Sequence, residues 1–377
     1  MLEDIQYLFN QIYTNNIPSA IQHFFSDVYL FCLHKDLNDA SKLRPIGIPT
    51  AIRRIIARHV AQTFKSKFAE ELLPFNFAVG IPNGGVTIIN AIQLGIEKYI
   101  TNREKVGQIP TRAAVFFDLS NMFNNISRVE FFDIIATSFP ELLPLTKLFY
   151  SNPGNVFHKW VDGEWKILHM EEGSSQSCPL SPILAALVVV RLLKPIDHSL
   201  RQRALQRFEA GILHDDNYGG RTHLLGFIDD ISTLVPLEDL LFLCDQFKQC
   251  GIPLGCFINK GKTRILTSTN GISPIQAISI SNPSLAQDIT SAISRYSTTP
   301  NKHDPLQHDP IELTDGFRLL GLPVGNREFT ISFLLSRQAG LSNRKTRYYH
   351  DTTTNEYDAH DDNLHGQRHE DNIEQRE

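Results

Sequence analysis

The chain has 377 residues, of which 42% are hydrophobic and 20% are charged, and its formal net charge is −5. This composition excludes a chain too polar to bury a core, and the length suits one large domain with subdomains or two domains. The weakly acidic average by itself is only a weak argument against a nucleic-acid ligand.

Charge is unevenly distributed along the chain. Residues 42–67 contain seven basic residues and no acid, whereas residues 351–377 contain nine acids and two basic residues. One interpretation is a basic working surface offset by an acidic tail. The other is a helix with one solvated basic face, and the segment alone supports both equally.

The five cysteines lack the spacing of a disulfide framework or a zinc site, because no C-x-x-C pair occurs and no histidine neighbours Cys244, Cys250 or Cys256. Free thiols in an intracellular protein are therefore expected. The first residues lack the basic start and apolar run of a signal peptide. The longest apolar stretch, 183–193, is short and interrupted by Arg191, so we expect no membrane span. These features leave nucleus and cytoplasm open.

The first hundred residues predict mainly helices. Apolar residues recur at helical spacing over 1–35, and again over 51–72 and 86–100. Between these segments, the prolines and glycine of 42–50 favour an extended segment, and the glycines of 77–85 favour a loop.

The middle of the chain predicts strands mixed with helices. Residues 113–119 are an apolar run typical of a buried strand, followed by an asparagine-rich turn and a helix from Ser127. Residues 156–160 and 165–170 flank a V-D-G-E turn and predict a hairpin. An apolar helix is expected to begin at Pro182.

Further along, 224–227 and 231–235 predict two short strands, and 237–250 predict a helix. Residues 267–315 are rich in Ser, Thr, Asn, Pro and Gln and are expected to form a loop-rich insertion. The polar tail after residue 340 is expected to be disordered. Because strands and helices do not alternate strictly, the pattern favours an α+β fold with a sheet backed by helices.

Three aspartates follow or interrupt apolar runs. Asp118 ends the run 113–117, while Asp229 and Asp230 lie between the two predicted strands near residue 228. Strands packed in one sheet could bring all three carboxylates to the same edge. Clustered carboxylates repel one another unless cations neutralise them, and two Mg²⁺ ions held in this way serve phosphoryl transfer.

Seven short blocks stand in order along residues 40–325. They read L-R-P-I (43–46), G-I-P-N-G-G (80–85), D-L-S-N-M-F-N-N-I (118–126), Q-S-C-P-L-S-P (176–182), F-I-D-D (227–230), N-K-G-K-T (259–263) and F-R-L-L-G (317–321). In type and order these blocks resemble those of reverse transcriptases, especially the reverse transcriptases of non-LTR (LINE-type) retrotransposons.

The resemblance implies a right-hand polymerase whose palm is a small antiparallel sheet backed by helices, with fingers, with the thumb largely missing and with a disordered C-terminal tail. The implied segments are 1–112 for N-terminal helices and fingers, 113–266 for the palm with a fingers-like insertion at about 127–172, 267–315 for the polar insertion, 316–340 for the end of the palm and start of the thumb, and 341–377 for the tail.

The resemblance also implies roles for the acids. Asp118 and Asp229 would bind two Mg²⁺ ions, with the carbonyl of Leu119 as a plausible addition, and Asp230 would support the pair electrostatically. The reaction implied is attack of a primer 3′-OH on a dNTP, directed by an RNA template, as in an RNA-directed DNA polymerase. The partners would be RNA template, DNA primer and dNTP, with no membrane.

Four more residues receive roles from the resemblance, each beside a structural alternative. Phe123 would exclude the ribose 2′-OH, or else serve as a core aromatic. Gln176 would lie against nucleotide and template, near a helix entry that the prolines explain. Lys262 would reach the triphosphate or protonate pyrophosphate, or else be a solvated turn residue. Arg44 would contact phosphates of template or triphosphate.

The chain departs from the family pattern at Ser177, where glycine usually follows the glutamine, at Ile228, where alanine is common, and after Gly321, where little sequence remains for a thumb. An alternative is therefore an inactive palm-like nucleic-acid-binding remnant or scaffold. A third is an RNA-templated RNA polymerase, which Phe123 and the P-L-S-P block disfavour. No block resembles an endonuclease, an RNase H domain or a Cys/His knuckle.

Overall fold

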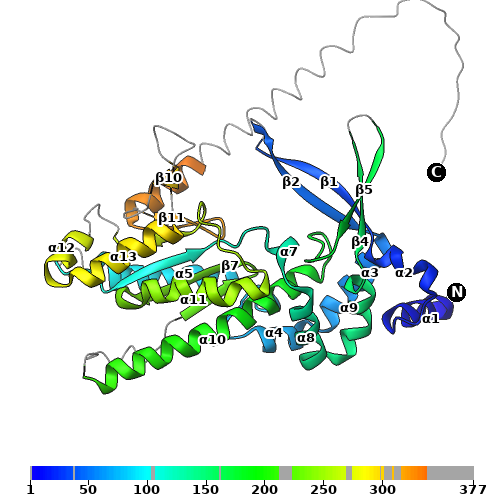
Figure 1. Ribbon diagram of the computed structural model, residues 1–377, viewed down its shortest axis with the longest axis horizontal. Coiled ribbons are helices and arrows are strands. Elements are labelled where there is room, and N and C mark those ends of the chain that lie inside the picture. Colours follow the sequence, from blue (N-terminus) through cyan, green and yellow to red (C-terminus); the bar gives the residue numbers. More distant parts are fainter. Residues whose placement is uncertain are drawn as a thin grey trace, which may run out of the picture. The chain divides into compact units, whose positions relative to one another are not determined.

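We describe a computed structural model of the chain (Figure 1). The description covers residues 2–36, 39–102, 107–160, 163–211, 223–268, 274–297, 299–300, 308–309 and 316–337. The chain divides into two compact units, Met1–Asn326 and Arg327–Glu377. In the second unit the structure describes one helix over 327–337. The expected disorder of 341–377 lies outside the described residues.

The central element of the first unit is a four-stranded antiparallel sheet, which we call the palm sheet. Its strand order is β6-β7-β3-β8, with β3 at Arg112–Phe117, β6 at His223–Phe227, β7 at Asp230–Pro236 and β8 at Arg264–Leu266. The predicted strands at 113–119, 224–227 and 231–235 are thereby confirmed. All six residues of β3 are buried, which explains why this strand reads as an uninterrupted apolar run.

Alternation along β3 divides the palm core between two faces. Ala113, Val115 and Phe117 join a large cluster with helices α10 (Ser181–Glu209), α11 (Leu240–Gly251) and α13 (Pro283–Tyr296). Ala114 and Phe116 join a smaller cluster with α5 (Gly84–Ile96). Since successive side chains of a strand point to opposite faces, helices cover both faces of this sheet. The predicted α+β class is confirmed.

A second four-stranded sheet, which we call the finger sheet, has the order β2-β1-β4-β5. Its strands are β1 (Val28–Asp36), β2 (Asp39–Pro49), β4 (Gly154–Lys159) and β5 (Trp165–Met170). β1 pairs antiparallel with β2 and parallel with β4, and β4 pairs antiparallel with β5. Figure 1 shows the β1–β2 and β4–β5 hairpins as ribbons that extend beyond the neighbouring helices. The extended segment at 42–50 and the hairpin are confirmed.

The helical prediction over 1–35 is wrong from Val28 onward. Helices α1 (Leu2–Tyr13) and α2 (Ser19–Ser26) end before β1 begins at Val28. From Tyr29 to Leu33 the apolar residues pair with β2, and this tertiary pairing decides their conformation.

The loop prediction for 267–315 is wrong for 274–296, which form α12 (Pro274–Ser281) and α13. In α13 the side chains of Ala286, Ile289 and Ile293 recur on one face and are buried in the palm core. Asn282 begins the helix, because its side chain accepts a hydrogen bond from the backbone N–H of Leu285.

The remaining elements connect these layers. They are α3 (Ala51–Thr63), α4 (Lys65–Leu72), a π-helical turn (Glu97–Thr101), α7 (Met122–Asn125), α8 (Arg128–Ser138), α9 (Leu143–Tyr150), the hairpin β11 (Gly316–Leu319) and β12 (Leu322–Gly325), and the two-residue strands β9 (Thr299–Pro300) and β10 (His308–Asp309). None of the helices in the described part of the chain has the length and apolarity needed to cross a membrane.

Candidate active site

The palm sheet gathers the three aspartates at one edge. β3 pairs with β7 so that Phe117 lies opposite Ile231, and the next residue of each strand toward the edge is Asp118 or Asp230. Phe227 of β6 lies opposite Asp230, which leaves Ile228 and Asp229 as a two-residue hairpin turn. Acids about a hundred positions apart in the chain therefore meet at the end of neighbouring strands, as the apolar runs before them predict.

The carboxylates perturb one another's ionisation. Burial, followed by the charges of Asp229 and Asp118, raises the pKa of Asp230 from 3.8 to about 6. The pKa of Asp229 is also raised, mainly by burial and further by Asp118, while a backbone hydrogen bond and Lys262 act in the opposite direction. The site therefore carries more negative charge than its surroundings stabilise.

Lys262 supplies the positive charge nearest to Asp118. Its Nζ lies 3.2 Å from both carboxylate oxygens of Asp118. The lysine follows a turn whose Asn259 donates its backbone N–H to the carbonyl of Asp118 at 2.8 Å. Leu119 forms a β-bridge with Ile258. The predicted N-x-x-K-T block thus lies beside the first aspartate.

The donor set fits a hard divalent cation in its chemistry, although the described residues contain no preassembled group of three His, Cys, Asp or Glu side chains able to hold a metal ion. Magnesium prefers carboxylate oxygens and binds through one or two of them together with substrate phosphates. Burial and the neighbouring carboxylates raise the pKa values of Asp229 and Asp230, and bound cations would relieve this unfavourable negative charge.

Sequence reasoning missed Asn76, whose side chain holds the turn that carries Asp229. Its Nδ2 donates to the carbonyl of Ile228 at 3.0 Å, and its Oδ1 accepts from the backbone N–H groups of Ile228 and Ala78. Asn76 is fully buried, and Ile228 has a φ of 58°. A branched residue rarely adopts this left-handed conformation, so the turn needs outside support. The sequence around Asn76, F-N-F-A, contains nothing that predicts a contact with Ile228.

The loop that carries Gln176 is fastened at several points. Ser174 donates its backbone N–H to the carbonyl of Phe123 at 2.6 Å. Arg128 is buried, and its guanidinium donates to the carbonyls of Tyr150, Met170 and Gly173. These bonds join the loop to α7 and α8, so Gln176 enters the site from a fixed backbone.

Ser177 fastens the same loop to the finger sheet. Its hydroxyl donates to the carbonyl of Gly47 in β2 at 2.6 Å. A glycine at position 177 could not make this bond. The departure from the family pattern at this position therefore has a specific structural role in this chain.

Gln176 and Asn124 line a cavity of about 310 Å³ between the loop and the finger sheet. Pro45 and Gly47 of β2 also line this cavity. Because neighbours alternate along a strand, Arg44 lies on the other face of this sheet. Phe123 is half-buried and packs against the large core. This placement is compatible with a ring that excludes a ribose 2′-OH and with a core aromatic.

A separate cavity of about 330 Å³ adjoins the acids themselves. Asp118, Asp230 and Lys262 line it together with Arg264 and Arg318. Leu319 and Leu320 of the F-R-L-L-G block also contribute to its wall. A cavity lined by both acids and basic side chains can hold a ligand that carries phosphate groups and a cation.

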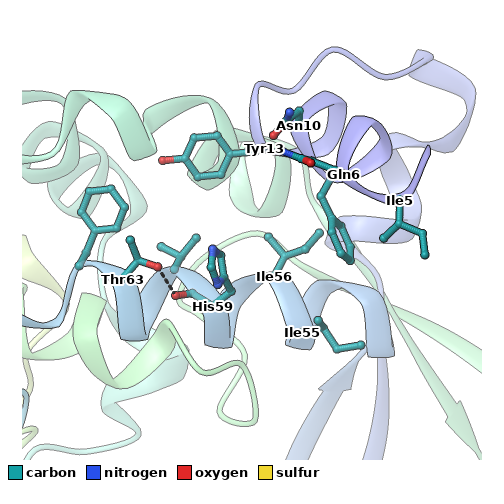
Figure 2. A pocket seen from close by; sticks show the side chains of 11 residues that line it. Ile5, Gln6, Asn10, Tyr13, Ile55, Ile56, His59 and Thr63 are labelled. Atoms are coloured by element: carbon teal, nitrogen blue, oxygen red, sulfur yellow. Dashed lines mark hydrogen bonds between the residues drawn. The ribbon is translucent and has the colours of Figure 1, made fainter. Parts of the chain in front are cut away.

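A larger cavity of about 720 Å³ lies between α1 and α3 and contains none of the predicted site residues (Figure 2). Ile5, Phe9 and Ile55 give it an apolar lining, and the Thr63 hydroxyl donates to the carbonyl of His59 at 3.0 Å. No acid lines it. The candidate active site is therefore at the palm edge and not in this larger cavity.

Comparison with known proteins identifies the family. A family model described as reverse transcriptase (RNA-dependent DNA polymerase) matches residues 33–324. No curated protein matches the chain in sequence.

Among solved structures, the chain is similar to telomerase from Candida albicans in complex with a fragment of telomeric RNA, with 13% identity and a TM-score of 0.42 over 71% of this chain and 46% of that one. It is also similar to apo telomerase from Candida tropicalis, with 11% identity and a TM-score of 0.46 over 70% of this chain and 49% of that one. The chain spans about half the length of these solved chains.

Proposed function

The chain belongs to the reverse transcriptase (RNA-dependent DNA polymerase) family, and from this membership we propose that it is the polymerase core of a non-LTR (LINE-type) retrotransposon reverse transcriptase. The reaction is transfer of a nucleotide from a dNTP to the 3′-OH of a DNA primer on an RNA template. The observation that carries the proposal is the meeting of Asp118, Asp229 and Asp230 at one edge of the palm sheet beside Lys262.

Asp118 and Asp229 are the residues that would hold two Mg²⁺ ions, and Asp230 would add negative charge beside them. When bound, such ions supply activation of the primer hydroxyl, stabilisation of the leaving oxygen and neutralisation of phosphoryl charge. The chain's own contribution is to hold repelling carboxylates together, through the pairing of β3 with β7 and through the clamp of Asn76 on the turn.

The other residues position the substrates. Phe123 would exclude a ribose 2′-OH, and Gln176 would contact the nucleotide and its template base from the cavity beside β2. Lys262 would move from Asp118 to the triphosphate and donate a proton to the leaving pyrophosphate, which its exposed position permits. Arg44 would bind a template phosphate, since it lies on the finger-sheet face away from Gln176.

The segment boundaries expected from the blocks are part of the proposal. In it, 1–112 and 127–172 supply the fingers, 113–266 supply the palm, and 316–340 lead toward a thumb. The proposal places the protein inside the cell.

A second candidate function is an inactive palm-like scaffold that binds nucleic acid. The observation that favours it is the ion pair between Lys262 and Asp118, which already neutralises an acid assigned to metal. In this case Asp118 would serve stability, and the basic segment 42–67 would provide binding.

The test is primer extension on poly(rA)/oligo(dT) with Mg²⁺ and dTTP. We expect extension by the wild type and none by Asp229→Ala, with equal binding of the duplex by both proteins. Equal binding without extension by the wild type would reject the polymerase and support the scaffold. Incorporation of rNTP by Phe123→Ala, but not by the wild type, would establish the role of this ring.

A further inference from the structure

The ammonium group of Lys262 lies directly against the first aspartate of the palm edge. Its Nζ is 3.2 Å from each of the two carboxylate oxygens of Asp118. In the described part of the chain, Asp118 is the acid of the three that forms a salt bridge, and Lys262 is its partner. An aspartate that the proposed function assigns to metal therefore already has a counter-ion from the protein itself.

The backbone keeps Lys262 beside Asp118. The N–H of Asn259 donates to the carbonyl of Asp118 at 2.8 Å, and the N–H of Asp118 donates to the Thr263 hydroxyl at 3.4 Å. The N–H groups of Lys262 and Thr263 donate to the carbonyl of Asn259 at 3.1 and 2.8 Å. These bonds fix the backbone of Lys262 next to the aspartate and leave its side chain as the part that can move.

The side-chain contact itself is of an exchangeable kind. The side chains of Lys262 and Asp118 are 55% and 26% exposed, and ion pairs with this much exposure contribute little to stability. By contrast, Arg203 and Arg207 pair with Asp239, whose side chain is only 1% exposed. The pair at Asp239 is built into the fold, whereas the pair at Asp118 is open to a competing cation.

Lys262 is also the basic residue of this cavity that can leave most easily. Arg264 lines the same cavity, but its Nη1 donates to the carbonyls of Gly261 and Thr263, each at 2.9 Å. In the described part of the chain, the Nζ of Lys262 has Asp118 as its hydrogen-bond partner and no other. An ammonium on a flexible stem makes a single-point contact, which a divalent cation with its preference for carboxylate oxygens can replace.

We propose that Lys262 is an exchangeable counter-ion of Asp118, which it occupies in the metal-free protein and yields to a divalent cation. The inference rests on the proposed function, because that function assigns Asp118 to metal, and it adds a regulation of the same site. Release of Lys262 and occupation of Asp118 by the cation are then one event. The ammonium becomes available to a triphosphate only after the cation is in place, and the exchange lowers the affinity of the site for that cation.

Mn²⁺ binding tests this exchange without primer or dNTP. The full chain is titrated with Mn²⁺ at one pH and one ionic strength, and electron paramagnetic resonance measures the unbound ion. Lys262→Met removes the ammonium, and we expect about three- to fivefold tighter binding than in the wild type, near the upper limit for an exposed ion pair. Lys260→Met is the matched control, because it removes the same charge from an exposed position of the same turn. Its effect is expected to stay below about twofold, since salt screens charges that do not touch the site.

Lys262→Arg separates the contact from the charge. This variant keeps the positive charge, and a guanidinium binds a carboxylate more strongly through two parallel N–H groups. We therefore expect Mn²⁺ to bind Lys262→Arg at least about twofold more weakly than the wild type. Opposite effects of the two substitutions at position 262 would show that the contact with Asp118 controls the affinity.

Two results would overturn the proposal: equal Mn²⁺ affinities of Lys262→Met and Lys260→Met, or binding by Lys262→Arg that is as tight as in the wild type. Absence of Mn²⁺ binding by the wild type and by all three variants would reject the metal assignment, and with it both the proposed function and this inference. Failure of primer extension alongside the expected Mn²⁺ affinities would count against the polymerase and leave the exchange at Asp118 established.

Discussion

The palm sheet and the finger sheet have four strands each, yet they differ in what covers them. Every residue of β3 is buried between two helical layers, whereas β5 is exposed along nearly all its length. The palm sheet can therefore hold repelling carboxylates at its edge, because the rest of the sheet is fixed by packing. The finger sheet contributes little core and offers both faces for contact. In this chain, the palm sheet holds side chains in fixed positions, whereas the finger sheet exposes its residues to solvent and ligands.

The largest test of this difference is a pair of phenylalanine substitutions. Phe117 of β3 is buried and stacks on Phe247 with ring centroids 3.9 Å apart, whereas Phe31 of β1 is 54% exposed. Phe117→Ala is expected to lower the free energy of unfolding by about 3–5 kcal/mol, because it opens a cavity in the core. Phe31→Ala is expected to change it by less than about 0.5 kcal/mol. Urea denaturation of both proteins measures the difference, and similar losses would contradict it.

The second test removes the clamp on the palm turn. Asn76→Ala deletes the hydrogen bonds to Ile228, and we expect kcat of primer extension to fall by about 100-fold, the effect of a small displacement of a reacting group. KM is expected to change little. Adding Ile228→Gly, which adopts the left-handed conformation freely, is expected to recover part of kcat. A fall explained entirely by unfolded protein in circular dichroism would argue against a positioning role.

The third test concerns the hydrogen bond that joins the Gln176 loop to the finger sheet. Ser177→Ala removes the hydrogen bond to Gly47, and we expect KM for dTTP to rise by about fivefold, in keeping with about 1 kcal/mol for one hydrogen bond. Ser175→Ala is a matched control, since the buried hydroxyl of Ser175 has no partner. Steady-state kinetics of both variants measure KM for dTTP. Equal increases in the two variants would show that the hydrogen bond between Ser177 and Gly47 has no specific effect.

The smallest test measures what the palm edge costs in stability. The folded-state pKa of Asp230 is about 6, above its ordinary value of 3.8, so the folded protein loses stability as pH rises through this interval. In EDTA, Asp230→Asn is expected to stabilise the fold above pH 6 by only about 0.5 kcal/mol, because Asp230 lies at the rim of the sheet, where solvent still reaches it and screens the charges. The gain should vanish below pH 4, and thermal melts across this range will show whether it does.

The same contrast explains which features could be predicted from the sequence. The palm strands and their aspartates were predictable because continuous apolar runs end at Asp118 and surround Asp229. β1 was mistaken for a helix, since its apolar run carries no turn signal before Val28 and its conformation depends on β2. The helix α13 was missed because the surrounding segment 267–315 is rich in Ser, Thr, Asn, Pro and Gln, although Ala286, Ile289 and Ile293 have helical spacing.

Long-range contacts could not be read from local sequence. Asn76 meets Ile228 across 152 positions, and Ser177 meets Gly47 across 130. Neither residue differs in its local pattern from an ordinary asparagine or serine. The face on which Arg44 lies was predictable in principle, because it alternates with Pro45 in an extended segment.

The contact between Asn76 and the Asp229 turn also orders events during folding. Asn76 is synthesised long before the turn at Ile228. Its hydrogen-bond partner therefore becomes available only after β3, α8 and α10 have been synthesised. The left-handed conformation of Ile228 is unfavourable on its own, so we expect the turn to be completed only after the earlier segment has docked. A fragment beginning at Arg112 would include all three aspartates and still lack the side chain that holds the turn of Asp229.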